Sequence, residues 1–233
     1  MKEKRSGFRL AHADLWILTL AALALAVFFA YEIAVRNTQM PISRSLLLCV
    51  ICLLFYLGGY LLSKRTGNRL VLKRLFLLFF ILYGYLLLSL TLLDPSMGRG
   101  ENSVYGHMKP TRATYTERFV NLVPLRSIYH VYIKGFLKGY VNAYYTLLNL
   151  LGNVVALMPL AFFLPYLFPR QRKWYLFLPT VTAVVLLIEF LQYLFMIGSC
   201  DVDDLILNAG GAFLFFLFLN IPTVKKWVLR LTS

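Results

Sequence analysis

Residues 174–197 read WYLFLPTVTAVVLLIEFLQYLFMI, an apolar run of 24 residues that contains a single charged side chain, Glu189. At a rise of 1.5 Å per residue, about 20 apolar residues in an α-helix cross the hydrocarbon core of a bilayer. This stretch therefore predicts a transmembrane helix. A carboxyl group inside hydrocarbon is costly to keep, so Glu189 is at once a candidate functional residue.

The whole chain has the composition of a multi-pass membrane protein. Of its 233 residues, 60% are apolar and only 15% are charged, whereas about half of a soluble domain is apolar. This excess excludes soluble enzymes, disulfide scaffolds and disordered chains. Apolar stretches of spanning length occur six times, and they predict six transmembrane helices at about residues 14–35, 45–63, 75–93, 146–168, 174–197 and 205–221.

The distribution of Lys and Arg predicts the orientation of these helices. The chain has 24 basic and 10 acidic residues. Basic residues concentrate in four short segments: the N-terminus, the second and fourth predicted loops, and the C-terminal tail. Short loops of membrane proteins that are rich in Lys and Arg stay in the cytoplasm. Both termini are therefore expected to be cytoplasmic. Because the basic residues follow the membrane face, they do not indicate a nucleic-acid partner.

These patterns predict an all-α integral membrane protein with four parts. Residues 1–93 hold three N-terminal helices, residues 94–145 form a long outer loop, residues 146–221 hold helices four to six, and residues 222–233 form a basic cytoplasmic tail. Within the outer loop, the stretch to about residue 109 is expected to be flexible. Residues 127–141 have helical spacing, with His130, Lys134 and Lys138 in one stripe, and predict an interfacial amphipathic helix on the outer leaflet. Its basic face either touches anionic lipid in general or has a specific headgroup role.

Polar residues gather in the last three predicted helices. Asn153 lies in the fourth, Glu189 and Gln192 share one face of the fifth, and the acidic loop before the sixth is followed by Asn208. Pro159 and Pro165 each remove a backbone hydrogen bond from the fourth helix and are expected to kink it. Short connections make these helices antiparallel neighbours. Two interpretations remain open: an outward-facing polar pocket, or interhelical hydrogen bonds that lock the bundle. The candidate ligand-binding residues are Asn121, Arg126, Asn153, Glu189, Gln192, Asp201, Asp203, Asp204 and Asn208.

The same residues resemble the VanZ-like family of bacterial membrane proteins. The resemblance begins at Asn121-Leu122-Val123-Pro124 and continues through Asn153, Pro159 and Pro165. It is completed by Glu189-x-x-Gln192 and by the element Asp201-x-Asp203-Asp204-x-x-x-Asn208, and it covers about residues 118–220. It implies a multi-pass protein of the bacterial cell membrane, whose family namesake is associated with resistance to the glycopeptide teicoplanin. This chain lacks the Arg that many members carry before the acidic loop; Arg118 or Arg126 is a candidate to balance the carboxylates instead.

Three functions are compatible with this sequence. The first is a non-enzymatic envelope protein that binds or moves an amphiphile, such as an anionic lipid, a lipid-linked wall precursor or a lipoglycopeptide, at the outward-facing pocket. The second is a metal-assisted membrane enzyme acting on a lipid phosphate, with Glu189 as acid or base. The third is an ion-coupled transporter. The first is favoured, with membrane lipids as partners and no cofactor or metal, because neither a nucleophile–base pair nor a continuous polar path is evident.

Overall fold

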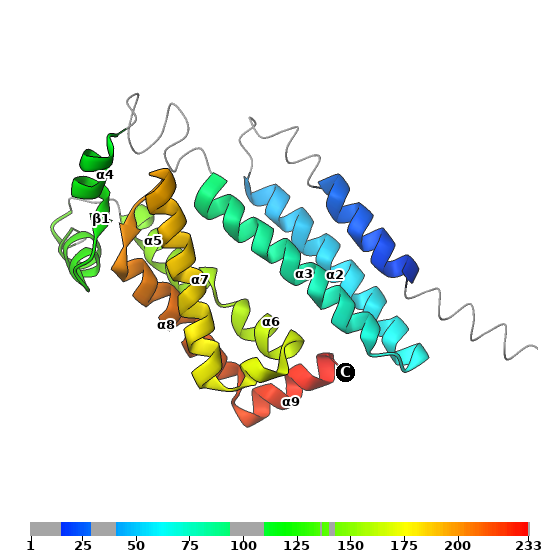
Figure 1. Cartoon of the computed structure of the whole chain (residues 1–233). Coiled ribbons are helices and arrows are strands. Elements are labelled where there is room, and N and C mark those ends of the chain that lie inside the picture. The colour runs from blue at the N-terminus through cyan, green and yellow to red at the C-terminus, as the bar shows by residue number, and fades with distance from the viewer. Residues whose placement is uncertain (1–14, 29–40, 94–109, 136, 140–142, 233) are drawn as a thin grey trace, which may run out of the picture. The chain divides into compact units, whose positions relative to one another are not determined.

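A computed structural model describes residues 15–28, 41–93, 110–135, 137–139 and 143–232, and this part of the chain is mostly helical (Figure 1). The chain divides into two compact units. Residues 1–82 and 225–233 make up the first, which we call the N-terminal unit. Residues 83–224 make up the second, which we call the core unit, and it holds every predicted ligand-binding residue.

The helices and strands follow the chain in a simple order. The helix Leu15–Phe28 comes first. After it come α2 (Pro41–Thr66), α3 (Leu70–Leu88), the π-helical turn η1 (Ser89–Leu93), α4 (Arg112–Phe119), β1 (Val120–Asn121) and the π-helix η3 (Ile128–Gly135). The remainder comprises α5 (Ala143–Ala156), α6 (Leu160–Leu167), the 3-10 turn η4 (Pro169–Arg172), α7 (Trp174–Phe195), β2 (Cys200–Asp201), α8 (Val202–Leu219) and α9 (Pro222–Leu231).

Five of the six predicted spans correspond to helices that are long and apolar enough to cross a membrane. These candidate spans are Leu48–Thr66, Leu70–Leu92, Asn149–Leu167, Trp174–Phe195 and Val202–Leu219. Of the first predicted span, residues 14–35, the structure describes only the apolar helix Leu15–Phe28, and residues 29–40 lie outside the described part. The structure thus supports an all-α membrane protein, while six spans and cytoplasmic termini stay predictions.

Apolar contacts hold the N-terminal unit together. Leu72 and Leu75 of α3 are buried, and Gly59 of α2 lies so close to Leu75 that an added Cβ would be 3.0 Å from a Leu75 methyl carbon. The Tyr56 ring packs 5.9 Å from the Phe76 ring. Its hydroxyl donates to the carbonyl of Leu231, 2.9 Å away, which holds the end of α9 against α2.

The fourth predicted span is interrupted, as its prolines indicate. The helix α5 ends at Ala156, and α6 begins at Leu160 directly after Pro159. Proline has no N–H and its ring clashes with the preceding turn of a helix. The predicted kink is therefore confirmed at Pro159, whereas Pro165 lies inside α6.

Two close approaches join α8 to its neighbours in the core unit. A Cβ added to Gly211 would lie 2.0 Å from the carbonyl oxygen of Val154 on α5, so only glycine allows this approach of the two backbones. The Phe216 ring of α8 also stacks on the Phe177 ring of α7, with ring centroids 4.5 Å apart. The helices that carry the polar residues are thus held at fixed positions.

The outer loop has more structure than the sequence indicates. Residues 112–119 form α4, and β1 pairs in parallel with β2, with Asn121 opposite Asp201. Within the predicted helix over residues 127–141 the structure describes the π-helix Ile128–Gly135, with residue 137 also helical, while residues 136, 140 and 141 lie outside the described part. The expected flexible stretch, residues 94–109, lies outside the described residues. Much of the expected basic tail is the amphipathic helix α9.

Candidate functional site

Asp203 is a completely buried carboxylate of the core unit, with 0% of its surface exposed. Its two carboxylate oxygens accept three backbone N–H groups from one loop. Oδ1 accepts from Leu125 at 2.5 Å, and Oδ2 accepts from Ser127 at 2.7 Å and from Ile128 at 3.0 Å. Several N–H donors can offset the desolvation of a buried carboxylate. Asp203 therefore fixes the backbone of residues 125–128 above the start of α8.

Asp201 holds the same loop from its other end. Its side chain accepts a hydrogen bond from the Asn121 amide at 2.9 Å and another from the Ser127 hydroxyl. It also caps α8 by accepting the Asp203 N–H at 2.9 Å, which is the common use of aspartate before a helix. The Asn121 side chain in turn accepts the N–H of Val123 at 3.2 Å. We call residues 121–128 the clamped loop.

Clamping turns apolar side chains of this loop outward. Leu122, Val123 and Leu125 are exposed by 73%, 55% and 57%. Leu125 also has a left-handed backbone, with φ at 64°, which is uncommon for a residue other than glycine or asparagine. The hydrogen bond from its N–H to Asp203 accompanies this conformation. The surrounding contacts thus impose a geometry in which the loop does not bury its own leucines.

The other two carboxylates, Glu189 and Asp204, connect the helices of the core unit. Glu189 is buried on α7, and its Oε2 accepts the N–H of Asp201 at 3.0 Å. Asp204 of α8 accepts a hydrogen bond from the Asn153 amide of α5. Asn208 donates to the carbonyl of Asp204, one turn back, at 2.8 Å. The hydrogen bonds of these groups therefore link α5, α7 and α8.

Cys200, the first residue of β2, contacts the Glu189 side chain. Its free thiol forms a hydrogen bond with the Glu189 carboxylate. Burial, followed by the negative charge of Glu189, raises the pKa of the Cys200 thiol from 9.0 to about 11. The thiol is accordingly protonated at neutral pH and can donate to the carboxylate.

With this geometry in view, comparison with known proteins gives one result. The model of the VanZ/LLP1 family matches residues 76–223. The chain belongs to this VanZ-like family. No curated protein and no solved structure matches the chain. The matched segment contains almost all of the core unit and every residue of the carboxylate network, and the family resemblance predicted from the sequence is confirmed.

The VanZ-like core also contains contacts that the sequence did not indicate. Tyr115 of α4 is fully buried and its hydroxyl lies 3.4 Å from the carbonyls of Gln192 and Ile197. The Arg112 guanidinium donates to the carbonyls of Tyr193 and Leu194 at 3.0 and 3.3 Å. The last carbonyls of a helix have no partner within it, so α4 supplies donors to the end of α7. Neither residue belongs to a motif that could have predicted this contact.

The predicted site residues of the VanZ-like core separate into two groups. Seven of them join the network just described, whereas the Gln192 side chain donates to the carbonyl of Thr91 in η1 at 3.3 Å. Arg126 instead is exposed, as is Arg118, and the hydrogen-bond partners of the four carboxylates are backbone N–H, amide, hydroxyl and thiol groups. Ser127 is a partner that the prediction missed. That these residues bind a ligand stays a prediction.

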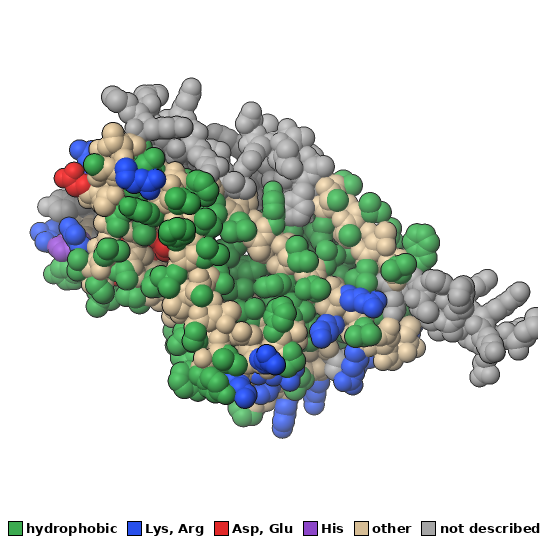
Figure 2. Space-filling model, in the orientation of Figure 1, with side chains coloured by type: hydrophobic (Ala, Val, Ile, Leu, Met, Phe, Trp, Pro, Cys, Tyr) green, Lys and Arg blue, Asp and Glu red, His purple; other side chains and the backbone are tan. Residues whose placement is uncertain are grey.

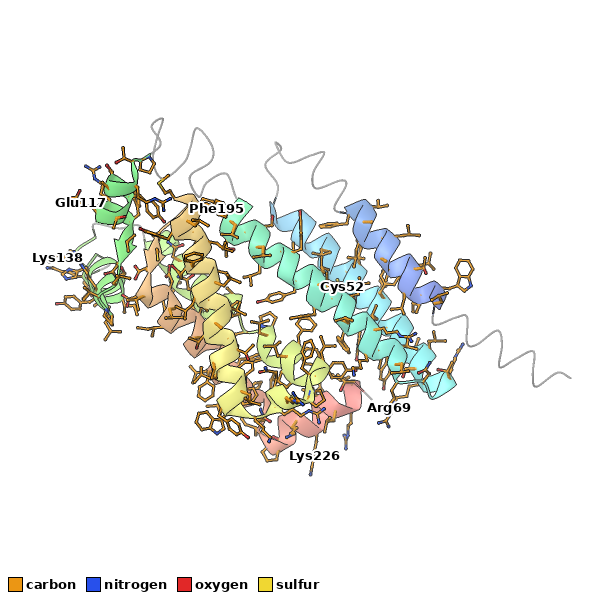
Figure 3. The ribbon with its side chains drawn as sticks, in the orientation of Figure 1. Cys52, Arg69, Glu117, Lys138, Phe195 and Lys226 are labelled. Carbon is orange, nitrogen blue, oxygen red and sulfur yellow. The ribbon has the colours of Figure 1, made fainter. Side chains whose placement is uncertain are left out.

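A metal site was not expected, although the enzyme hypothesis invoked one. In the described ranges, no three His, Cys, Asp or Glu side chains are placed to share an ion. Asp and Glu side chains take up little of the face shown in Figure 2. Glu117, which projects from α4 in Figure 3, is exposed and separate from the network.

Proposed function

We infer that this VanZ-like protein binds an anionic amphiphile at the membrane surface, with the clamped loop as the contact. The apolar part of the ligand lies against Leu122, Val123 and Leu125, and its anionic headgroup lies near Arg126. The ligand class comprises anionic lipids, lipid-linked wall precursors and lipoglycopeptides such as teicoplanin. The observation that carries this proposal is the fixed exposure of three apolar side chains beside an arginine.

The energetics of the loop support a binding role. An exposed apolar side chain gains about 25 cal/mol for each Å² that a ligand or lipid covers, so a flexible loop would tend to fold such side chains inward. Here Asp201 and Asp203 hold the backbone in place. A preorganised loop loses less conformational entropy when the ligand binds, and this improves affinity.

The charge of the surface beside the loop also favours an anionic headgroup. Arg126 is followed by His130 and Lys134 of η3, which are exposed, and by Lys138, which projects outward in Figure 3. Exposed apolar residues, Tyr129 and Ile133, alternate with them. An amphipathic segment of this kind is typical of a membrane interface. In this proposal the buried carboxylates position the loop and do not meet the headgroup, because like charges would repel it.

The test measures ligand binding by the full chain in nanodiscs made of zwitterionic lipid. The probes are a synthetic polyprenyl diphosphate, phosphatidylglycerol and teicoplanin. Leu122→Gln and Arg126→Gln are each expected to weaken binding of at least one probe by about fivefold, or roughly 1 kcal/mol. Arg118→Gln, which removes an exposed arginine from α4, is the matched control and is expected to leave binding unchanged.

A second readout connects binding to resistance. Teicoplanin susceptibility is compared in cells that express the chain or either loop variant at equal membrane levels. A change that the wild-type chain produces and both variants lose would support an effect on glycopeptides. If both variants bind all three probes as the wild type does, while thermal unfolding in detergent is unaltered, the proposal is wrong.

A further inference from the structure

The N-terminal unit has a strongly basic edge that the proposed function does not use. Exposed cations lie at the end of α2, at the start of α3 and on α9, and we call this set the basic rim: Lys64, Arg65, Arg69, Lys73, Arg74, Lys225, Lys226 and Arg230. The residues of this unit that the structure describes, 15–28, 41–82 and 225–232, include no Asp or Glu. Acidic side chains of this part of the unit therefore do not neutralise the rim.

The helix α9 has the residue pattern of an interfacial helix. Its 10 residues are too few to cross a bilayer. Lys226 and Arg230 are four apart and share one exposed face. Val228 and Leu231 are half-buried on the opposite face, and Trp227 is 61% exposed between the two faces. Tryptophan favours the boundary between hydrocarbon and headgroups.

Contacts within the unit hold α9 close to α2. The Tyr56 hydroxyl of α2 donates to the Leu231 carbonyl at 2.9 Å, and Thr232 is buried. Figure 3 shows Lys226 projecting outward from α9. From Tyr56 to Lys64 is eight residues, or about 12 Å along the helix. The last turn of α9 therefore lies against the second half of α2, the half that ends at Lys64 and Arg65, and all of these cations belong to one unit.

We propose that the basic rim is a docking surface for anionic phospholipid headgroups of the adjoining leaflet. Each Lys or Arg close to an anionic membrane surface strengthens its association with that surface by about fivefold. The side chains of Lys226 and Arg230 reach the headgroups, and Trp227 enters the boundary beside them. This surface does not depend on the clamped loop, and either proposal can fail without the other.

The experiment uses Trp227 as the reporter. In the full chain, Trp16→Phe and Trp174→Phe leave Trp227 as the single tryptophan. The protein is reconstituted in phosphatidylcholine vesicles that contain a small fraction of either brominated phosphatidylglycerol or brominated phosphatidylcholine. We expect Trp227 fluorescence to be quenched several times more by the anionic brominated lipid. Equal quenching by the two lipids would overturn the proposal.

Charge variants assign the preference to the rim. Lys226→Gln with Arg230→Gln is expected to reduce the excess quenching by at least about fivefold, whereas Arg118→Gln with Lys138→Gln, which removes two cations from other elements, leaves it unchanged.

Salt weakens the preference for the anionic lipid by screening. At matched ionic strength, phosphate and chloride must act alike; selective loss in phosphate would indicate a free-ion site and would contradict lipid docking. An excess that survives the rim variant, with Trp227 still at its native emission wavelength, would contradict it as well.

Discussion

The two units of this protein join their helices in different ways. Packing between α2 and α3 in the N-terminal unit relies on leucines, aromatic rings and the small residue Gly59. The core unit has similar apolar contacts, such as Phe177 on Phe216. It adds a network of four carboxylates on α7, β2 and α8, whose partners come from α5, β2, α8 and the clamped loop.

The difference matters because lipid removes the usual driving force for packing. Apolar helices gain little by leaving lipid for each other, so their association rests on shape and on a few hydrogen bonds. Shape alone admits several similar packings of leucine-rich helices. A buried carboxylate with three N–H partners admits only one, since a displaced loop would leave it unsatisfied. The core unit is accordingly expected to be the less tolerant of substitution.

The largest expected effect is at Asp203. Asp203→Ala removes the acceptor of three buried N–H groups, and each unsatisfied group costs about 1–3 kcal/mol. We expect the free energy of unfolding to fall by roughly 3 kcal/mol or more. In the N-terminal unit, Ser63→Ala at a buried position is expected to change it by less than about 1 kcal/mol. Unfolding in mixed detergent micelles, followed by circular dichroism, measures both.

Asp203→Asn refines this prediction. The amide keeps one oxygen to accept hydrogen bonds but places an NH₂ group opposite an N–H donor. The free energy of unfolding of Asp203→Asn should therefore lie between those of the wild type and Asp203→Ala. If Asp203→Ala and Ser63→Ala cost the same, the two units would not differ in the way described.

A smaller effect is expected at the crossing of α5 and α8. A methyl group at Gly211 would meet the Val154 backbone carbonyl at 2.0 Å, and backbone cannot move aside as a side chain can. Gly211→Ala is expected to cost about 2–3 kcal/mol, as overpacking does. Gly210→Ala, with nothing within 4 Å, should be neutral or stabilise by up to about 1 kcal/mol.

The matching position in the N-terminal unit is Gly59. There an added methyl would crowd only the tip of the Leu75 side chain, at 3.0 Å, which can rotate, and would make ordinary contacts with Leu72 and Val71 at 3.8 and 3.9 Å. Gly59→Ala should therefore change the free energy of unfolding by less than about 1 kcal/mol. An unfolding midpoint that falls as far for Gly59→Ala as for Gly211→Ala would contradict the assignment of rigid packing to the core unit.

The sequence allowed much of the fold to be predicted, because bilayer thickness fixes how long an apolar helix must be. Five spans, the break at Pro159 and the family follow from length, proline and motif. The structure of residues 112–128 could not be predicted in this way. Its shape depends on Asn121 pairing with Asp201, 80 residues further on, and no local periodicity encodes such a contact.

The membership of the polar network was predictable, and its partners were not. Polar side chains in hydrocarbon are rare enough that Asn153, Glu189 and Asn208 stand out. Which donors satisfy Asp203 could not be read from residue types, because those donors are backbone N–H groups that every residue except proline carries. The exposed leucine and valine side chains of the clamped loop follow from the same backbone geometry.

The smallest effect concerns a single proton in the network. The Cys200 thiol has a pKa of about 11 because of burial and of the Glu189 carboxylate beside it. Since only the thiolate attacks an alkylating reagent, Cys200 should react slowly at pH 8 and faster as the pH rises toward 11. The measurement is the rate of reaction with a small iodoacetamide in the full chain carrying Cys49→Ala and Cys52→Ala. Ser199→Cys in a chain without Cys200 is the control, because position 199 is exposed on the same turn.

We expect Cys200 to react at least about 10-fold more slowly than the control cysteine at pH 8. Glu189→Gln removes the negative charge but keeps the size of the side chain, so it should lower the thiol pKa and recover part of that rate. Burial remains in this variant, so recovery should be incomplete. A Cys200 rate that equals the control at every pH would mean that the thiol is not in contact with Glu189. The junction of α7 and β2 would then be as loosely held as the apolar packing of the N-terminal unit.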